Sequence, residues 1–89
     1  MSYVSGRLFT GQVTGVTTAA QQLNATQNCR EVMIQNDPAN TGNLIVGTST
    51  AQYITLTPGQ AVTLPIISLT LIYVKMSTGT GTINWLCRD

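Results

Sequence analysis

The polar and apolar positions of this 89-residue chain follow the two-residue repeat of β-strands. Successive side chains of a strand point to opposite faces, so apolar residues at every second position mark one buried face. In residues 82–87, for example, Ile83, Trp85 and Cys87 share a face. The same kind of signal predicts strands at residues 3–10, 30–36, 43–47, 52–57, 61–64, 69–76 and 82–87. A further strand is expected at 12–18, although Val13 and Val16 are three positions apart and strict alternation fails there.

Turn residues separate these strands. Pro58-Gly59 fits a type II turn, because proline fixes φ at the first central position and glycine accepts the positive φ at the second. The glycine-rich segment 78–81 has the composition of a second turn. We therefore expect two hairpins, one between 52–57 and 61–64 and one between 69–76 and 82–87.

The expected fold is all-β, a compact antiparallel β-sandwich or barrel of about seven to eight short strands. Helix signals are confined to residues 19–23, which suffice for a single helical turn. One domain is expected over residues 1–89, because the chain is short and no linker interrupts it. Residues 28–87 form the main sandwich in this interpretation, and residues 1–27 form either an extended arm or peripheral strands.

Some strands carry apolar side chains on both faces. The two sets of alternating positions in 69–76 are Leu69, Leu71 and Tyr73 on one face and Ile72, Val74 and Met76 on the other. In 30–36, Met33 lies opposite Val32 and Ile34. An isolated two-layer sandwich buries only one face of each sheet, so the second face needs another cover.

Another subunit is the cover that we expect, because a chain of this size supports only a small core. Met33, Tyr73 and Met76 are the candidate residues of that subunit interface. The chain is therefore expected to form a homo-oligomer, with a trimer as the starting guess. The alternative cover is the N-terminal segment of the same chain, folded over the second apolar face.

The charge content is unusually low. Charged residues make up 8% of the chain and the net charge is +1, whereas about 25% is typical of soluble domains. Thr, Ser, Gln and Asn supply 33 of the 89 residues and provide the polar surface instead. The scattered cations do not form the basic patch of a nucleic-acid-binding protein, and no apolar run reaches the length of a membrane span.

Catalytic and metal-binding chemistry is not expected. The chain contains no histidine, which excludes the commonest acid–base group and the commonest metal ligand. Its three side-chain carboxylates are Glu31, Asp37 and Asp89, and none forms the paired arrangement of a glycosidase. Asp37 lies in an Asn-rich loop, where turn hydrogen bonds are expected rather than Ca²⁺. We therefore predict no enzyme activity, no catalytic or metal site and no cofactor.

The cysteines and the tryptophan each allow two interpretations. Cys29 and Cys87 either form a disulfide or remain two reduced, partly buried thiols, and the second is favoured by a cytoplasmic origin. Trp85 either packs in the core beside Ile83 and Cys87 or forms a sugar-stacking platform with Tyr73. The core position is favoured, because its neighbours on the same face are apolar.

Four runs of the sequence together resemble small virion proteins of tailed bacteriophages. They are residues 30–37, 42–47, 56–64 and 69–74: a strand ending in Asn, a strand ending in Val-Gly, a Leu-Thr-Pro-Gly turn and a strand ending in Ile-Tyr-Val. The pattern spans roughly residues 28–87. It is similar to head-decoration (cement) proteins or short tail accessory modules, and the resemblance brings no catalytic residues with it.

The resemblance implies a non-enzymatic structural protein of the virion that is made in the cytoplasm of a bacterial host. Its expected role is a homo-oligomeric capsid decoration protein that stabilises the phage head, with the major capsid protein as its second partner. Nucleic acid and membranes are not expected partners. The alternative is a phage tail or fibre accessory module that recognises a surface carbohydrate.

Overall fold

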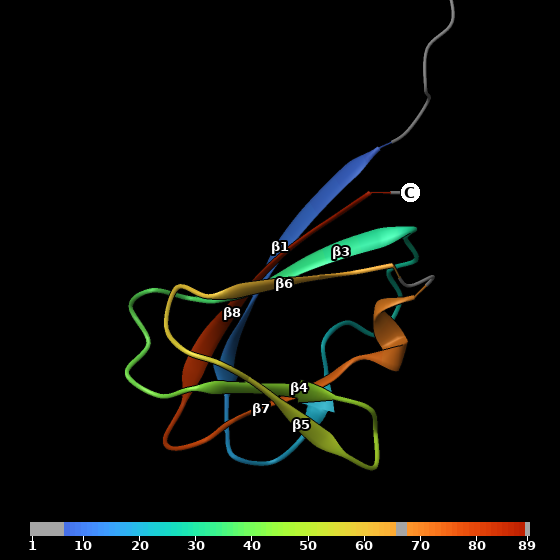
Figure 1. Ribbon diagram of the computed structural model, residues 1–89. Coiled ribbons are helices and arrows are strands. Elements are labelled where there is room, and N and C mark those ends of the chain that lie inside the picture. The colour runs from blue at the N-terminus through green and yellow to red at the C-terminus, as the bar shows by residue number, and fades with distance from the viewer. Residues whose placement is uncertain (1–6, 66–67, 89) are drawn as a thin grey trace, which may run out of the picture.

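The computed structural model describes residues 7–65 and 68–88. This part of the chain forms two four-stranded antiparallel sheets that pack face to face, as Figure 1 shows, which confirms the predicted all-β sandwich. The elements in chain order are β1 (Leu8–Val16), β2 (Gln21–Gln22), β3 (Glu31–Asn36), β4 (Leu44–Gly47), β5 (Gln52–Leu56), β6 (Ala61–Leu64), the short 3₁₀ helix η1 (Leu69–Leu71), β7 (Tyr73–Met76) and β8 (Gly81–Arg88).

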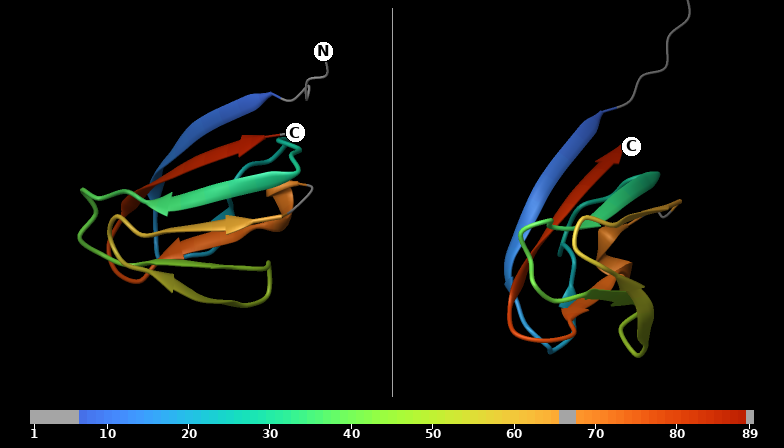
Figure 2. Two further views of the ribbon diagram at one scale, coloured as in Figure 1. Left: turned by 45° about the horizontal axis from the view of Figure 1, so that its top comes forward. Right: turned by 60° about the vertical axis from the view of Figure 1, so that its left-hand side comes forward.

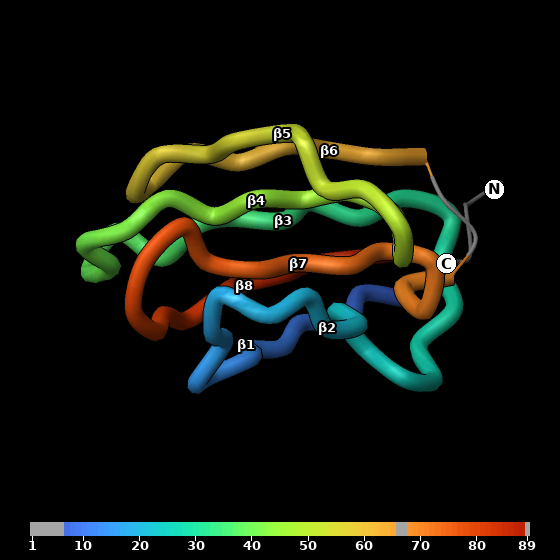
Figure 3. Tube along the Cα trace, turned by 90° about the horizontal axis from the view of Figure 1, so that it is seen from below, coloured from blue at the N-terminus to red at the C-terminus, as the bar shows by residue number. Residues whose placement is uncertain are grey.

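The order of the strands identifies the topology. The first sheet has the order β1-β8-β3-β6, and the second has the order β2-β7-β4-β5. Figure 3 looks through the second sheet onto the first, with β5 over β6, β4 over β3, β7 over β8 and β2 over β1. Eight antiparallel strands in two sheets of this order form a jelly roll.

The two predicted hairpins are wrong, although the Pro58-Gly59 turn is present. Gly59 has a φ of 89°, and the Gln60 amide donates to the Thr57 carbonyl at 2.9 Å, as a type II turn requires. The turn nevertheless joins β5 of the second sheet to β6 of the first. The segment after β7 likewise crosses to β8 in the other sheet (Figure 2).

The backbone of Asn36 explains why β5 does not pair with β6. The Asn36 amide donates to the Gln60 carbonyl at 3.0 Å, and the Asn36 carbonyl accepts from the Gly59 amide at 2.8 Å. The end of β3 therefore takes the pairing position beside β6 that a hairpin would have given to β5. The turn becomes an arch between the sheets, and β5 pairs with β4 instead.

Three other segments differ from the sequence-based expectation. The predicted strands at 3–10 and 12–18 are one strand, β1, with a β-bulge between Val13 and Val16; the first six residues of the chain lie outside the described residues. The expected helical turn at 19–23 contains strand β2. The strand predicted at 69–76 begins with a 3₁₀ turn, which the Ser68 hydroxyl caps by accepting from the Thr70 amide, and only its second half is strand β7.

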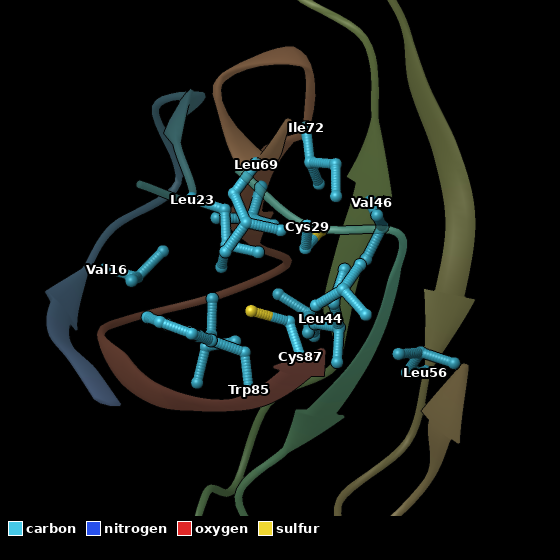
Figure 4. Packing of buried hydrophobic residues seen from close by; sticks show 14 of the residues in the cluster. Val16, Leu23, Cys29, Leu44, Val46, Leu56, Leu69, Ile72, Trp85 and Cys87 are labelled. Carbon is cyan, nitrogen blue, oxygen red and sulfur yellow. The ribbon is translucent and has the colours of Figure 1, made fainter. Parts of the chain in front are cut away.

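The core lies between the two sheets (Figure 4). The alternation in the sequence explains its composition, because the inward positions of β3, β4, β7 and β8 are the buried ones. The buried apolar residues are Val16, Leu23, Cys29, Val32, Ile34, Leu44, Val46, Leu56, Leu69, Ile72, Val74, Met76, Ile83, Trp85 and Cys87. Phe9, Val13, Val62 and Leu64 pack against them from partly buried positions.

One polar side chain, that of Asn36, is buried at the end of the core beside the turn between β5 and β6. Asn36 is fully buried, and its Nδ2 donates to the carbonyls of Gly42 at 3.1 Å and Leu56 at 2.9 Å. Its Oδ1 accepts from Asn40 Nδ2 at 2.6 Å. Buried polar groups require such partners. This amide therefore connects β3, the β3–β4 loop and the end of β5.

Candidate interaction surfaces

The structure separates the three residues that the sequence nominated for a subunit interface. Met76 is 1% exposed and lies in the core, where its thioether packs against Gly81 and faces the region of Gly42. Met33 and Tyr73 are half-buried on β3 and β7, which belong to different sheets. One contiguous contact through all three residues is therefore not possible in this fold, and Met76 is excluded from any subunit contact.

The second half of 69–76 shows how much apolar surface one subunit covers by itself. Ile72, Val74 and Met76 point inward and are buried, as the expected parity requires. Leu71 is 54% exposed and Tyr73 is half-buried. The subunit therefore encloses one of the two apolar faces and leaves part of the other in solvent.

The outer face of the first sheet carries exposed apolar side chains of β1 and β8. Leu8 is 72% exposed and Leu86 is 39% exposed, and the side chain of Met33 lies beside Leu86 because the two are register partners. Together with Thr63, these residues line a hollow of about 230 Å³. We call this region the first-sheet face.

Polar groups border the first-sheet face on two sides. At one end, Arg88 Nε donates to Glu31 Oε1 at 3.2 Å, and both side chains are about half exposed. At the other end, a row of amides crosses three strands. Gln12 Nε2 donates to Asn84 Oδ1 at 2.9 Å, and Asn84 Nδ2 donates to Gln35 Oε1 at 3.1 Å.

A second apolar surface lies at the side of the sandwich, between the edge strands β5 and β6. It is a groove of about 260 Å³ that includes Ile54, 58% exposed, and Leu71. The remaining lining residues are Val46, Gly47, Thr48, Val62, Leu64 and Ile72. The chain has no charged residue between Asp37 and Lys75, so none of the residues that line the groove is charged.

The sequence could not reveal this groove. Alternation along 52–57 predicts that Ile54 and Leu56 share a face, yet Leu56 is 7% exposed while Ile54 is open to solvent. A β-bulge leaves Tyr53 without a register partner on β4, because Val46 pairs with Ile54 and Gly47 pairs with Gln52. Exposure here follows from the position of β5 at the edge of its sheet, which only the topology determines.

Trp85 does not form a carbohydrate platform with Tyr73. Its side chain is 7% exposed and points into the core, as Figure 4 shows, whereas Tyr73 lies on a strand of the opposite sheet. The predicted core position of Trp85 is therefore confirmed. The pair that motivated the carbohydrate-binding alternative is not formed.

The carboxylates of Glu31 and Asp37 hold structural positions, and Asp89 lies outside the described residues. Glu31 forms the ion pair with Arg88. Asp37 Oδ1 accepts from the Ala39 amide at 2.8 Å, and Oδ2 accepts from Asn84 Nδ2 at 3.1 Å, which is the expected turn role. Within residues 7–65 and 68–88, no three His, Cys, Asp or Glu side chains are grouped as metal ligands would be. In the same ranges, no helix has the length and hydropathy needed to cross a membrane.

The two cysteines are buried thiols rather than a disulfide. Cys29 precedes β3 and Cys87 lies on β8, and their side chains share a hydrogen bond. Burial raises the pKa of the Cys29 thiol, while the hydrogen bonds to Cys87 and to the Glu31 backbone act in the opposite direction. A thiol that stays protonated is a weak nucleophile, so burial acts against the reactivity of Cys29.

Comparisons with known proteins yield no match to any family model, curated protein or solved structure. The function therefore has to be argued from the surfaces described above.

Proposed function

We propose that this chain is a non-enzymatic, homo-oligomeric structural protein of a tailed-bacteriophage virion, and specifically a capsid decoration protein that stabilises the head. The observation that carries the proposal is exposed apolar surface on two separate sides of so small a subunit. The first-sheet face includes Leu8 and Leu86, and the groove beside β5 includes Ile54 and Leu71. Contiguous exposed apolar surface is characteristic of sites that bind another protein.

Two separate surfaces fit the requirements of a decoration protein, which contacts its own copies and the capsid shell. The low charge supports the same role, because association must then depend on apolar contact and hydrogen bonds. The strand order adds an argument by analogy. Jelly rolls occur in viral capsid proteins, and also in lectins and cupins, so the fold raises the expectation of a virion role without determining it.

Capsid heads of the encoding phage, prepared without this protein, provide the test. We expect the purified chain to bind such heads to saturation and to raise their temperature of disruption, since a bound cement protein stabilises only the assembled shell. Ile54→Asp, which places a charge in the groove, is expected to weaken head binding at least tenfold. Thr41→Asp, an exposed change in the β3–β4 loop, is the matched control.

Two results would contradict the proposal. Failure of the folded protein to bind heads at any concentration removes the decoration role. Saturable binding to tails or fibres instead of heads would support the tail accessory alternative.

A further inference from the structure

The first-sheet face consists of two complementary halves, one on β8 and one on β3. In the antiparallel register, Arg88 lies beside Glu31, Leu86 beside Met33 and Asn84 beside Gln35. All six side chains occupy alternate positions of their strands and point away from the core. The residues at the other positions of these strands point into the core and are buried: Val32, Ile34, Ile83, Trp85 and Cys87. The face therefore carries a charged row, an apolar row and an amide row, each with one member on either strand.

We propose that this face binds a second copy of the chain across a two-fold axis. The axis lies in the plane of the contact between the two copies, parallel to the strands and above the space between β8 and β3. Rotation by half a turn about this axis lays β8 of one copy over β3 of the other and keeps each row at the same height. Arg88 then faces the partner's Glu31, Leu86 faces the partner's Met33, and Asn84 faces the partner's Gln35. The inference rests on the self-association that the proposed function includes.

The chemistry of each row favours this arrangement. The cation of Arg88 meets a carboxylate, so the charges attract twice in each dimer because the contact is symmetric. Asn84 Nδ2 already donates to Gln35 Oε1 and Asp37 Oδ2 within the chain, so the bond that remains available across the contact is from Gln35 Nε2 to the partner's Asn84 Oδ1. Between these polar rows, Leu86 and Met33 lose contact with water, and this burial supplies the favourable apolar term.

The complementarity also explains why a second copy is the occupant. Arg88 and Glu31 lie at one end of the face, and the amides lie at the other, where Asn84 also donates to the Asp37 carboxylate. A shift of the partner by one row would place the charged side chains against Leu86 and Met33, where they would keep their ion pair within the chain but gain no charged partner across the contact. Face-to-face packing with strands within about 30° of parallel is ordinary for two sheets.

The size of the face sets the expected strength. Four strands about 4.8 Å apart and six residues of about 3.4 Å each cover roughly 20 Å by 20 Å. This footprint of roughly 400 Å² is about half of the 800 Å² per partner that a standard stable interface buries. We therefore expect a weak dimer in dilute solution, with a dissociation constant in the micromolar range or above.

A charge-exchange experiment tests the geometry directly. Arg88→Glu places two carboxylates against each other in its own dimer, and Glu31→Arg places two guanidinium groups against each other. Each single variant is expected to dimerise at least tenfold more weakly than the natural chain.

An equimolar mixture of the two variants restores the complementarity. The carboxylate introduced at position 88 of one chain would face the guanidinium introduced at position 31 of the other. The natural Arg88 and Glu31, one retained by each chain, would also face each other. The mixture should therefore recover the association that both variants lose, as measured by sedimentation equilibrium.

Two further variants control for the fold and for the location of the contact. Lys75→Glu changes a charge on the second sheet and is expected to leave dimerisation unchanged. Leu86→Asp should abolish dimerisation, whereas Leu71→Asp, at the side groove, should not. Thermal unfolding by circular dichroism identifies any variant that has lost its fold; Arg88 and Glu31 are exposed, and their ion pair contributes little to stability.

The possible results separate this inference from the proposed function. A chain that stays monomeric up to roughly millimolar concentration, a trimer, or a mixture of variants that associates no better than its components would each overturn the two-fold contact. Head binding is measured separately through the groove variant Ile54→Asp. Loss of the dimer with retained head binding therefore rejects this contact alone, and a dimer that does not bind heads rejects the decoration role alone.

Discussion

The indole of Trp85 lies where a side chain at position 11 of the neighbouring strand would stand. Gly11 and Trp85 are register partners on β1 and β8, and a Cβ at position 11 would come within 2.6 Å of Trp85 Cζ2. No side chain is tolerated at that distance. The glycine thus allows the large ring to pack under an edge strand, which explains why Trp85 is buried rather than available to a ligand.

Gly11→Ala is expected to lower the free energy of unfolding by about 1–3 kcal/mol, because the added methyl group overpacks the core and displaces the indole. Urea unfolding followed by tryptophan fluorescence measures both effects, and the native emission should shift toward the red as the ring gains contact with water. Thr14→Ala, an exposed change on the same strand, should stay within about 0.5 kcal/mol of the natural chain. Equal stability of the two variants would contradict the tight contact.

Asn36→Ala is expected to cost about 2–4 kcal/mol, since two buried carbonyls lose their donor and the amide volume is lost as well. Asn36→Asp separates these contributions. It keeps the shape of the side chain but, as a carboxylate, cannot donate to the carbonyls of Gly42 and Leu56. Both variants should unfold at lower urea concentration than the natural chain.

A double-mutant cycle with Asn40→Ala provides the control for this network. Asn40 Nδ2 donates to Asn36 Oδ1, so the effects of Asn36→Ala and Asn40→Ala should not add. Two results would contradict the proposed role of the Asn36 amide in connecting β3, the β3–β4 loop and the end of β5. One is additive effects of the two substitutions, and the other is a stability of Asn36→Asp at neutral pH equal to that of the natural chain.

The alternation of residues was sufficient to predict which side chains of β3 and β8 enter the core. Val32, Ile34, Ile83 and Trp85 are all buried as expected, because a two-residue period survives any arrangement of the strands. The same rule placed Met33 on an outer face. It could not decide which of the two faces of 69–76 was the inner one, so Tyr73 and Met76, which lie on opposite faces, were both nominated for the subunit interface.

The pairing of strands could not be read from the sequence. A Pro-Gly turn has the same local geometry in a hairpin and in an arch, and the choice here depends on hydrogen bonds from Asn36, more than 20 positions before the turn. The ion pair of Arg88 and Glu31 and the groove beside Ile54 depend in turn on register and on edge position. Both candidate surfaces are therefore consequences of long-range topology.

Gly47→Ala is expected to be destabilising by at least about 1–3 kcal/mol, because a Cβ there would come within 2.1 Å of the Ala51 carbonyl oxygen. The obstacle is backbone, and the turn that holds it in place is closed by the Thr48 amide donating to the same carbonyl at 2.8 Å. Thermal unfolding measures the loss.

Gly59 is the matched control for Gly47, because glycine is needed at position 59 for its positive φ and not for lack of space. It has a φ of 89° and no atoms within 4 Å of a built Cβ. Asparagine tolerates the third position of a type II turn, so Gly59→Asn should be mild and Gly47→Asn severe. Similar losses for the two asparagine variants would rule out the steric explanation at position 47.

The buried thiol of Cys29 gives the protein a stability that declines in alkaline solution. Because burial raises its pKa, the folded state holds the thiol proton more tightly than the unfolded state does. This contribution is fully present below the unfolded thiol pKa of about 8.5 and is lost as the pH rises through the folded value. The urea concentration at which half of the protein is unfolded should therefore decrease as the pH rises above about 8.5. Part of that fall should disappear in Cys29→Ala, which separates the thiol from other groups that titrate in the same range. An identical alkaline slope in Cys29→Ala and the natural chain would contradict the assignment.

Alkylation with iodoacetamide offers an independent measurement, because a protonated, buried thiol should react slowly in the folded protein and rapidly in urea.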